Sequence, residues 1–136
     1  MRVDAGVVLE STLMTWGWSL VLAGFASGAL IGLGFHREAF FGGYGSWRRR
    51  LLRLGHVACV ALGALQMLAA LSPAGGASGA LADACSVLWR TGAVAMPVVC
   101  FLSAWRPSFR HLFFVPVLSL AGAAACTLAL IQKGTS

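Results

Sequence analysis

The sequence predicts an all-α membrane protein in which four transmembrane helices form an up-down antiparallel bundle. Of its 136 residues, 59% are hydrophobic and only 10% are charged, whereas soluble domains contain about 25% charged residues. The mean hydropathy is +0.84. A globular core of this size could not bury so much apolar surface, so lipid is the expected solvent. The apolar residues also fall into four runs, each close to the ~20 residues that a helix needs to cross a bilayer.

Short polar or glycine- and proline-rich segments separate the four runs. The runs extend over residues 7–34, 51–71, 81–105 and 112–131. Because the backbone in lipid must satisfy its own hydrogen bonds, we expect each run to be a helix. The sequence "SPAGGASG" at 72–79 ends the second run, and Pro107 prevents the third from continuing into the fourth. Short connections make consecutive helices antiparallel neighbours, so residues 1–136 are expected to form one four-helix domain.

The basic residues are unequally divided between the two ends of this bundle. One end has the seven arginines of the first and third connections: Arg37, Arg48, Arg49, Arg50, Arg53, Arg106 and Arg110. The other end has Arg2 and Lys133. Connections rich in positive charge stay on the cytoplasmic side of a membrane. We therefore expect the protein to lie in a cytoplasmic (inner) membrane, with the arginine-rich connections in the cytoplasm and both termini on the outer side. The arginines between positions 48 and 53 are expected to anchor the chain in the inner leaflet through anionic headgroups.

The expected partners are the lipid bilayer and other membrane proteins. The net charge of +6 could also suggest nucleic acid. Here, however, the arginines flank apolar runs instead of covering a polar face, so no nucleic-acid partner is expected.

The first run contains a glycine zipper. Its members are Gly17, Gly24, Gly28 and Gly32. Small residues at this spacing leave a groove into which another helix can approach closely. We expect the protein's own second or fourth helix to fill it, and Ser119, Gly122 and Cys126 offer a complementary smooth stripe on the fourth. The alternative is a groove for a partner subunit or for self-association.

Arg90 is an ionisable residue well inside the third run, where a charge is costly unless it is paired or faces water. Asp83 precedes it by seven residues and shares its helical face, while Glu10 enters the first run from the same side of the membrane. We expect either a structural ion pair of Arg90 with Asp83 and Glu10 or snorkelling of Arg90 to the interface. The alternative is an outward-facing pocket in which Arg90 contacts an anion or a quinone headgroup.

Three histidines are expected at the cytoplasmic ends of the helices: His36, His56 and His111. Imidazoles at one depth can ligate a metal, and two can bind the iron of haem b. His56 is the most suggestive, because Gly55 and Gly63 leave room beside it. No H-x-x-x-H or C-x-x-C-H spacing supports such a site.

The sequence contains no motif for hydrolysis, phosphate binding or metal-dependent proteolysis. We therefore do not expect the chain to be catalytic on its own. The favoured interpretation is a small accessory or structural subunit of a larger membrane complex. The two alternatives are a haem- or metal-binding redox protein that uses His56 with His36 or His111, and a small-molecule or quinone-binding module centred on Arg90.

Overall fold

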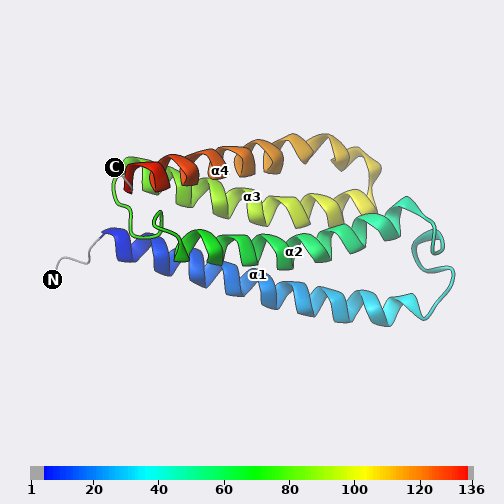
Figure 1. Ribbon diagram of the computed structural model, residues 1–136. Coiled ribbons are helices and arrows are strands. Elements are labelled where there is room, and N and C mark those ends of the chain that lie inside the picture. The colour runs from blue at the N-terminus through cyan, green and yellow to red at the C-terminus, as the bar shows by residue number, and fades with distance from the viewer. Residues whose placement is uncertain (1–4, 135–136) are drawn as a thin grey trace.

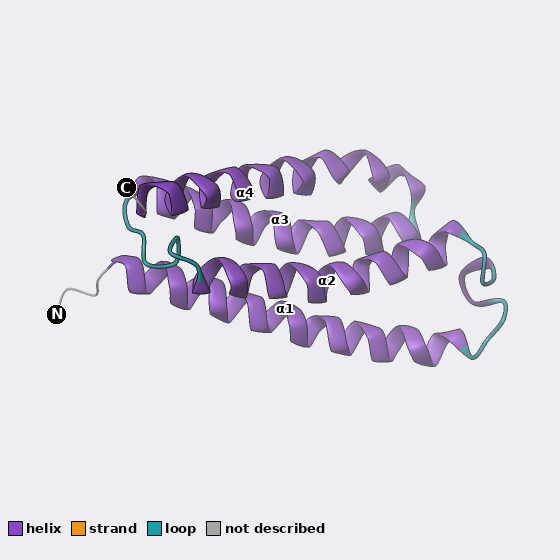
Figure 2. Ribbon diagram, in the orientation of Figure 1, coloured by secondary structure: helices purple, strands orange, loops and turns teal. Residues whose placement is uncertain are grey.

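The computed structural model describes residues 5–134, and the surroundings of the side chains from residue 9 onward. Four α-helices and two short 3₁₀ helices form this part of the chain, which contains no strand (Figure 2). They are α1 (Ala5–Phe35), η1 (Phe40–Gly42), α2 (Trp47–Leu71), α3 (Ala80–Trp105), η2 (Pro107–Phe113) and α4 (Phe114–Gly134). The predicted all-α fold with four long helices is confirmed. Arg2, which was counted on the side of the termini, lies outside the described residues.

The four helices run antiparallel and lie next to one another in sequence order (Figure 1). α2 packs against α1 on one side and α3 on the other, α3 packs against α4, and α1 touches α3 only slightly. The outer helices of the row are therefore α1 and α4. The connection 72–79 lies at the same end as the start of α1 and the end of α4, which we call the terminal end. The connections 36–46 and 106–113 lie at the opposite, arginine-rich end.

α2 begins at Trp47, four residues before its predicted start at 51. Ser46 caps it: the Ser46 Oγ accepts a hydrogen bond from the backbone N–H of Arg49 at 3.3 Å, which satisfies one of the free donors in the first turn. Arg48, Arg49 and Arg50 therefore belong to the first turn of a helix and not to a loop.

The short connection expected between α3 and α4 is formed by the 3₁₀ helix η2. Pro107 begins it. This position suits proline, because its missing N–H would have no partner in a first turn. α4 then begins at Phe114, two residues after the predicted start at 112.

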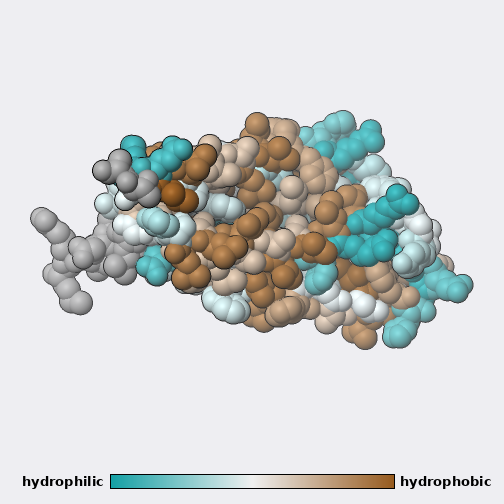
Figure 3. All heavy atoms as spheres, viewed as in Figure 1, coloured by the Kyte–Doolittle hydropathy of each residue, from teal (hydrophilic) through white to brown (hydrophobic). Residues whose placement is uncertain are grey.

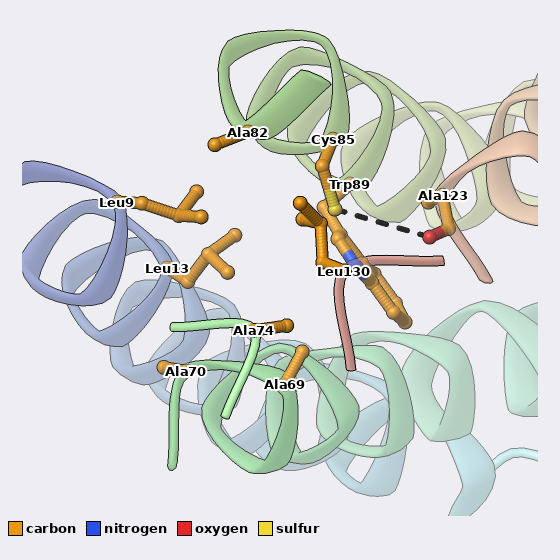
Figure 4. Packing of buried hydrophobic residues seen from close by; sticks show 10 residues of the cluster. All are labelled: Leu9, Leu13, Ala69, Ala70, Ala74, Ala82, Cys85, Trp89, Ala123 and Leu130. Carbon is orange, nitrogen blue, oxygen red and sulfur yellow. Dashed lines mark hydrogen bonds between the residues drawn. The ribbon is translucent and has the colours of Figure 1, made fainter. Parts of the chain in front are cut away.

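All four helices contribute to a buried cluster near the terminal end (Figure 4). Its residues are Leu9, Leu13, Ala69, Ala70, Ala74, Ala82, Cys85, Trp89, Ala123 and Leu130. The many alanines allow the helix backbones to approach closely, as is typical of helix packing in membranes. Trp89 fills the space toward α4, and its indole Nε1–H donates a hydrogen bond to the Thr127 Oγ1 at 3.0 Å.

The surface of the protein matches a bilayer. On the face that Figure 3 shows, apolar side chains cover most of the middle, and hydrophilic residues gather toward the ends. Each of the four helical segments is long and apolar enough to cross a membrane. These features indicate an integral membrane protein.

Candidate functional site

Three candidate glycines of α1 lie at its interface with α2, and at one point the two helices meet backbone to backbone through a pair of glycines. A Cβ atom placed on Gly17 would lie 2.8 Å from the carbonyl oxygen of Gly63, and one placed on Gly63 would lie 2.6 Å from that of Gly17. Both separations are shorter than any normal contact of a Cβ atom. Only glycine at both positions permits this approach.

The other glycines of the predicted zipper fall into two groups. Gly24 faces Val60 and Cys59 of α2, and Gly28 faces the ring of His56, whereas nothing lies within 4 Å of a Cβ on Gly32. Three of the four glycines therefore pack on α2. α4 does not complement them in the way that its small-residue stripe suggested, because Gly122 faces Leu88 of α3.

His56 occupies the space that Gly28 leaves open. Its Nδ1 donates a hydrogen bond to the carbonyl oxygen of Gly24 at 2.8 Å, and the hydroxyl of Ser27 donates to the same oxygen at 2.9 Å. A carbonyl can only accept, so a neutral His56 carries its proton on Nδ1 and has an unprotonated Nε2. That nitrogen has no hydrogen-bond partner among the described residues.

The three histidines do not form one cluster. His36 and His111 are exposed at the arginine-rich end. His56 is half-buried nine residues after the first residue of α2, which is about 14 Å along the helix axis. The expectation that it shares the depth of the other two is wrong, because α2 begins earlier than the apolar run. Within residues 5–134, no three side chains of His, Cys, Asp or Glu are grouped so that they could hold a metal ion.

Arg90 makes no ion pair with Asp83 or Glu10 in the described structure, and both carboxylates are exposed. Its Nε donates to the carbonyl oxygen of Ser86 in its own helix at 3.3 Å. The side chain lines an open pocket of about 320 Å³ together with Trp16, Val87, Thr91 and Val94. Arg90 therefore borders an open groove between α1 and α3, and it does not pin the two helices together.

Arg49 differs from the other arginines that were expected to anchor the inner leaflet, because only 3% of it is exposed. Its Nε donates to the carbonyl oxygen of Phe40 at 2.6 Å, and its Nη2 donates to those of Arg37 and Glu38 at 2.6 and 3.0 Å. The guanidinium also lies 4.8 Å from the ring centroid of Phe35. Arg49 thus fastens the connection 36–46 onto α2, and it is not available to a lipid headgroup.

The neighbouring arginines remain accessible to a headgroup. Arg48 and Arg50 are exposed, and Arg53 is half-buried. The guanidinium of Arg48 lies 5.9 Å from the ring of Trp47, and that of Arg53 lies 5.2 Å from the ring of Tyr44. Such cation–aromatic pairs are suited to the polar boundary of a membrane.

Gln66 was overlooked in the sequence because it lies within an apolar run. It is completely buried, and its Nε2 donates a long hydrogen bond of 3.4 Å to the carbonyl oxygen of Trp89 in α3. Its Oε1 has no partner among the described residues. A lone amide in the middle of an apolar helix is the signal that could have identified it, because polar side chains join helices in lipid.

No protein-family model matches this chain, and neither does any of the curated proteins or solved structures with which we compared it.

Proposed function

We propose that this integral membrane protein is a small accessory or structural subunit of a larger membrane complex, with its arginine-rich end in the cytoplasm. The orientation rests on the excess of arginine at that end. The absence of any recognised catalytic motif from the sequence agrees with a role in assembly.

One observation supports this function above the others. α1 packs on α2 along one face, and a second row of small side chains lies exposed on the rest of its surface: Ser11, Thr15, Ser19 and Ala23. The hydroxyls of Thr15 and Ser19 donate hydrogen bonds to carbonyl oxygens of α1 itself, both at 2.8 Å. They therefore lie against the helix and do not extend toward a neighbour. Small residues four apart form a smooth ridge, which is typical of contacts between membrane helices.

The test is purification of the intact assembly in a gentle detergent, followed by native mass spectrometry. We expect the chain within a particle of defined stoichiometry. Ser19→Leu should reduce the recovered complex about tenfold, as the loss of one good helix contact would. Ala125→Leu is the matched control, because it enlarges an exposed small residue of α4. Equal recovery of both variants would rule out α1 as the contact helix.

A second candidate function, haem or metal binding, is favoured by the geometry of His56 alone. Metal-bound histidines commonly donate their other ring N–H to a backbone carbonyl, as His56 donates to Gly24. Visible spectra of the native material, oxidised and reduced with dithionite, separate the two functions. A reducible Soret band that disappears in His56→Ala and persists in His111→Ala would favour a cytochrome. A spectrum without a Soret band would exclude haem and leave the accessory-subunit function.

A further inference from the structure

The arginine-rich end contains a pocket that none of the functions above uses. It has a volume of about 560 Å³ and lies between the first turn of α2 and η2. Its lining consists of two arginines and four largely apolar residues: Trp47, Arg50, Leu51, Pro107, Arg110 and Phe113. Cationic and hydrocarbon surfaces thus border the same space.

The two arginines of this pocket lack a counter-charge. Arg50 and Arg110 are exposed, and neither guanidinium is hydrogen-bonded, ion-paired or stacked on a ring within the described structure. Glu38 is the single described carboxylate at this end, and it lines a different pocket. The remaining described acids, Glu10 and Asp83, lie toward the terminal ends of α1 and α3. An anion from outside the chain would compensate the charge.

We propose that this pocket binds an anionic phospholipid, with Arg50 and Arg110 holding its phosphate. Guanidinium groups match phosphate oxygens with paired hydrogen bonds. The ligand must also cover the apolar walls formed by Leu51, Pro107 and Phe113. A phospholipid places its phosphate next to hydrocarbon, whereas free phosphate would leave those walls uncovered. Basic pockets between transmembrane helices on the cytoplasmic side bind lipid headgroups in this manner.

The pocket is distinct from the general attraction of a basic surface for anionic lipid. Arg48 and Arg106 lie at the same end of the protein and are exposed, but they do not line the pocket. A diffuse electrostatic effect would treat all four arginines alike, since each carries the same charge. A specific lipid site in the pocket would depend on Arg50 and Arg110 alone, because these two arginines line it. The proposal does not depend on whether the chain is an accessory subunit.

The experiment measures lipid retention by the full chain, purified in detergent, with native mass spectrometry. Dioleoyl phosphatidylglycerol is titrated against dioleoyl phosphatidylcholine. We expect one phosphatidylglycerol bound per chain in preference to phosphatidylcholine. Arg50→Gln and Arg110→Gln should each weaken that binding at least about tenfold, the loss expected for one charge-assisted contact. The matched control Arg106→Gln should remain within about twofold of the unmodified protein, because Arg106 is exposed at the same end and does not line the pocket.

Three results would overturn the proposal. Equal weakening in Arg50→Gln, Arg110→Gln and Arg106→Gln would show diffuse attraction, and equal retention of the two lipids would show no anion selectivity. Displacement of the bound lipid by millimolar inorganic phosphate would show a site for the free anion. This competition uses the unmodified chain, so it decides the matter even if a variant fails to fold. The thermal unfolding of each variant in phosphatidylcholine nanodiscs identifies such a failure.

Discussion

The Nδ1 of His56 donates a hydrogen bond to the carbonyl oxygen of Gly24 at 2.8 Å, and this bond joins the middle of α2 to the middle of α1. The ring fits because Gly28 has no side chain, and its Cε1 would lie only 2.6 Å from a Cβ there. A residue first considered as a metal ligand therefore also has a structural role. Both roles favour the same tautomer, so variants must separate them.

His56→Phe keeps an aromatic ring at this interface and removes the donor. We expect it to lower the free energy of unfolding by about 1 kcal/mol, the size of one hydrogen bond between membrane helices. Steric trapping in bicelles measures this quantity. His111→Phe is the control, because His111 is exposed and should tolerate the change. If His56→Phe unfolds like the unmodified protein, the hydrogen bond contributes nothing to stability.

Alanine should destabilise the protein at one glycine of α1 and not at another. Gly17→Ala places a methyl group against the Gly63 carbonyl, so α1 must move away from α2, and we expect destabilisation of about 1–3 kcal/mol from overpacking. Gly32→Ala meets nothing within 4 Å, and the better helix propensity of alanine should make it neutral or stabilising by up to about 1 kcal/mol. Unfolding free energies of the two variants give the comparison. If both variants lowered the free energy of unfolding by the same amount, the close contact between Gly17 and Gly63 would be contradicted.

Arg49→Lys should loosen the connection 36–46 while leaving the charge unchanged. Lysine cannot reproduce the fork that binds three carbonyl oxygens, and a hydrogen bond to a charged group is worth about 1.5–3 kcal/mol. We expect trypsin to cut after Arg37 about tenfold faster in proteoliposomes. Arg48→Lys is the matched control, since Arg48 is exposed. Identical cleavage rates would show that Arg49 does not hold the connection.

The contact between Trp89 and Thr127 can be measured with a double-mutant cycle. Trp89→Phe and Thr127→Val each remove one partner of the 3.0 Å hydrogen bond that links α3 to α4. We expect a coupling free energy of about 0.5–1.5 kcal/mol, the net contribution of a typical intramolecular hydrogen bond. Additive effects in the unfolding free energies would indicate that the two side chains act independently.

The lengths of apolar sequence predicted the helices well, because burying backbone in lipid leaves few alternatives to a helix. The start of α2 was missed because Arg48 and Arg50 are not apolar, although arginine is a good helix former and Ser46 supplies a cap. Hydropathy reports the extent of the membrane and not the extent of the helix. The burial of Arg49 was missed for a related reason: a charge can be satisfied by loop carbonyls that only the folded connection brings together.

The contacts of His56 could not be predicted from spacing. They depend on the rotation of α2 about its axis relative to α1, which is set by close approaches such as that of Gly17 to Gly63. The glycine zipper indicated that a helix would pack on α1, but its pattern carries no information on which one. The ion pair that was one expectation for Arg90 is absent from the described structure. The seven-residue spacing puts Asp83 and Arg90 on one face of α3, but the Arg90 guanidinium bonds to the Ser86 carbonyl of its own helix instead of to a carboxylate.

Photo-crosslinking in the native membrane tests the proposed role of α1 most directly. A photoreactive phenylalanine at Ser19 stands on the exposed ridge of α1, and one at Ala125 stands on the exposed face of α4. If this protein is an accessory subunit, the probe at Ser19 should form one discrete adduct with a protein that also co-purifies stoichiometrically, and the probe at Ala125 should not form that adduct. Adducts with lipid alone from both positions would show that α1 faces the bilayer and would contradict the proposed function.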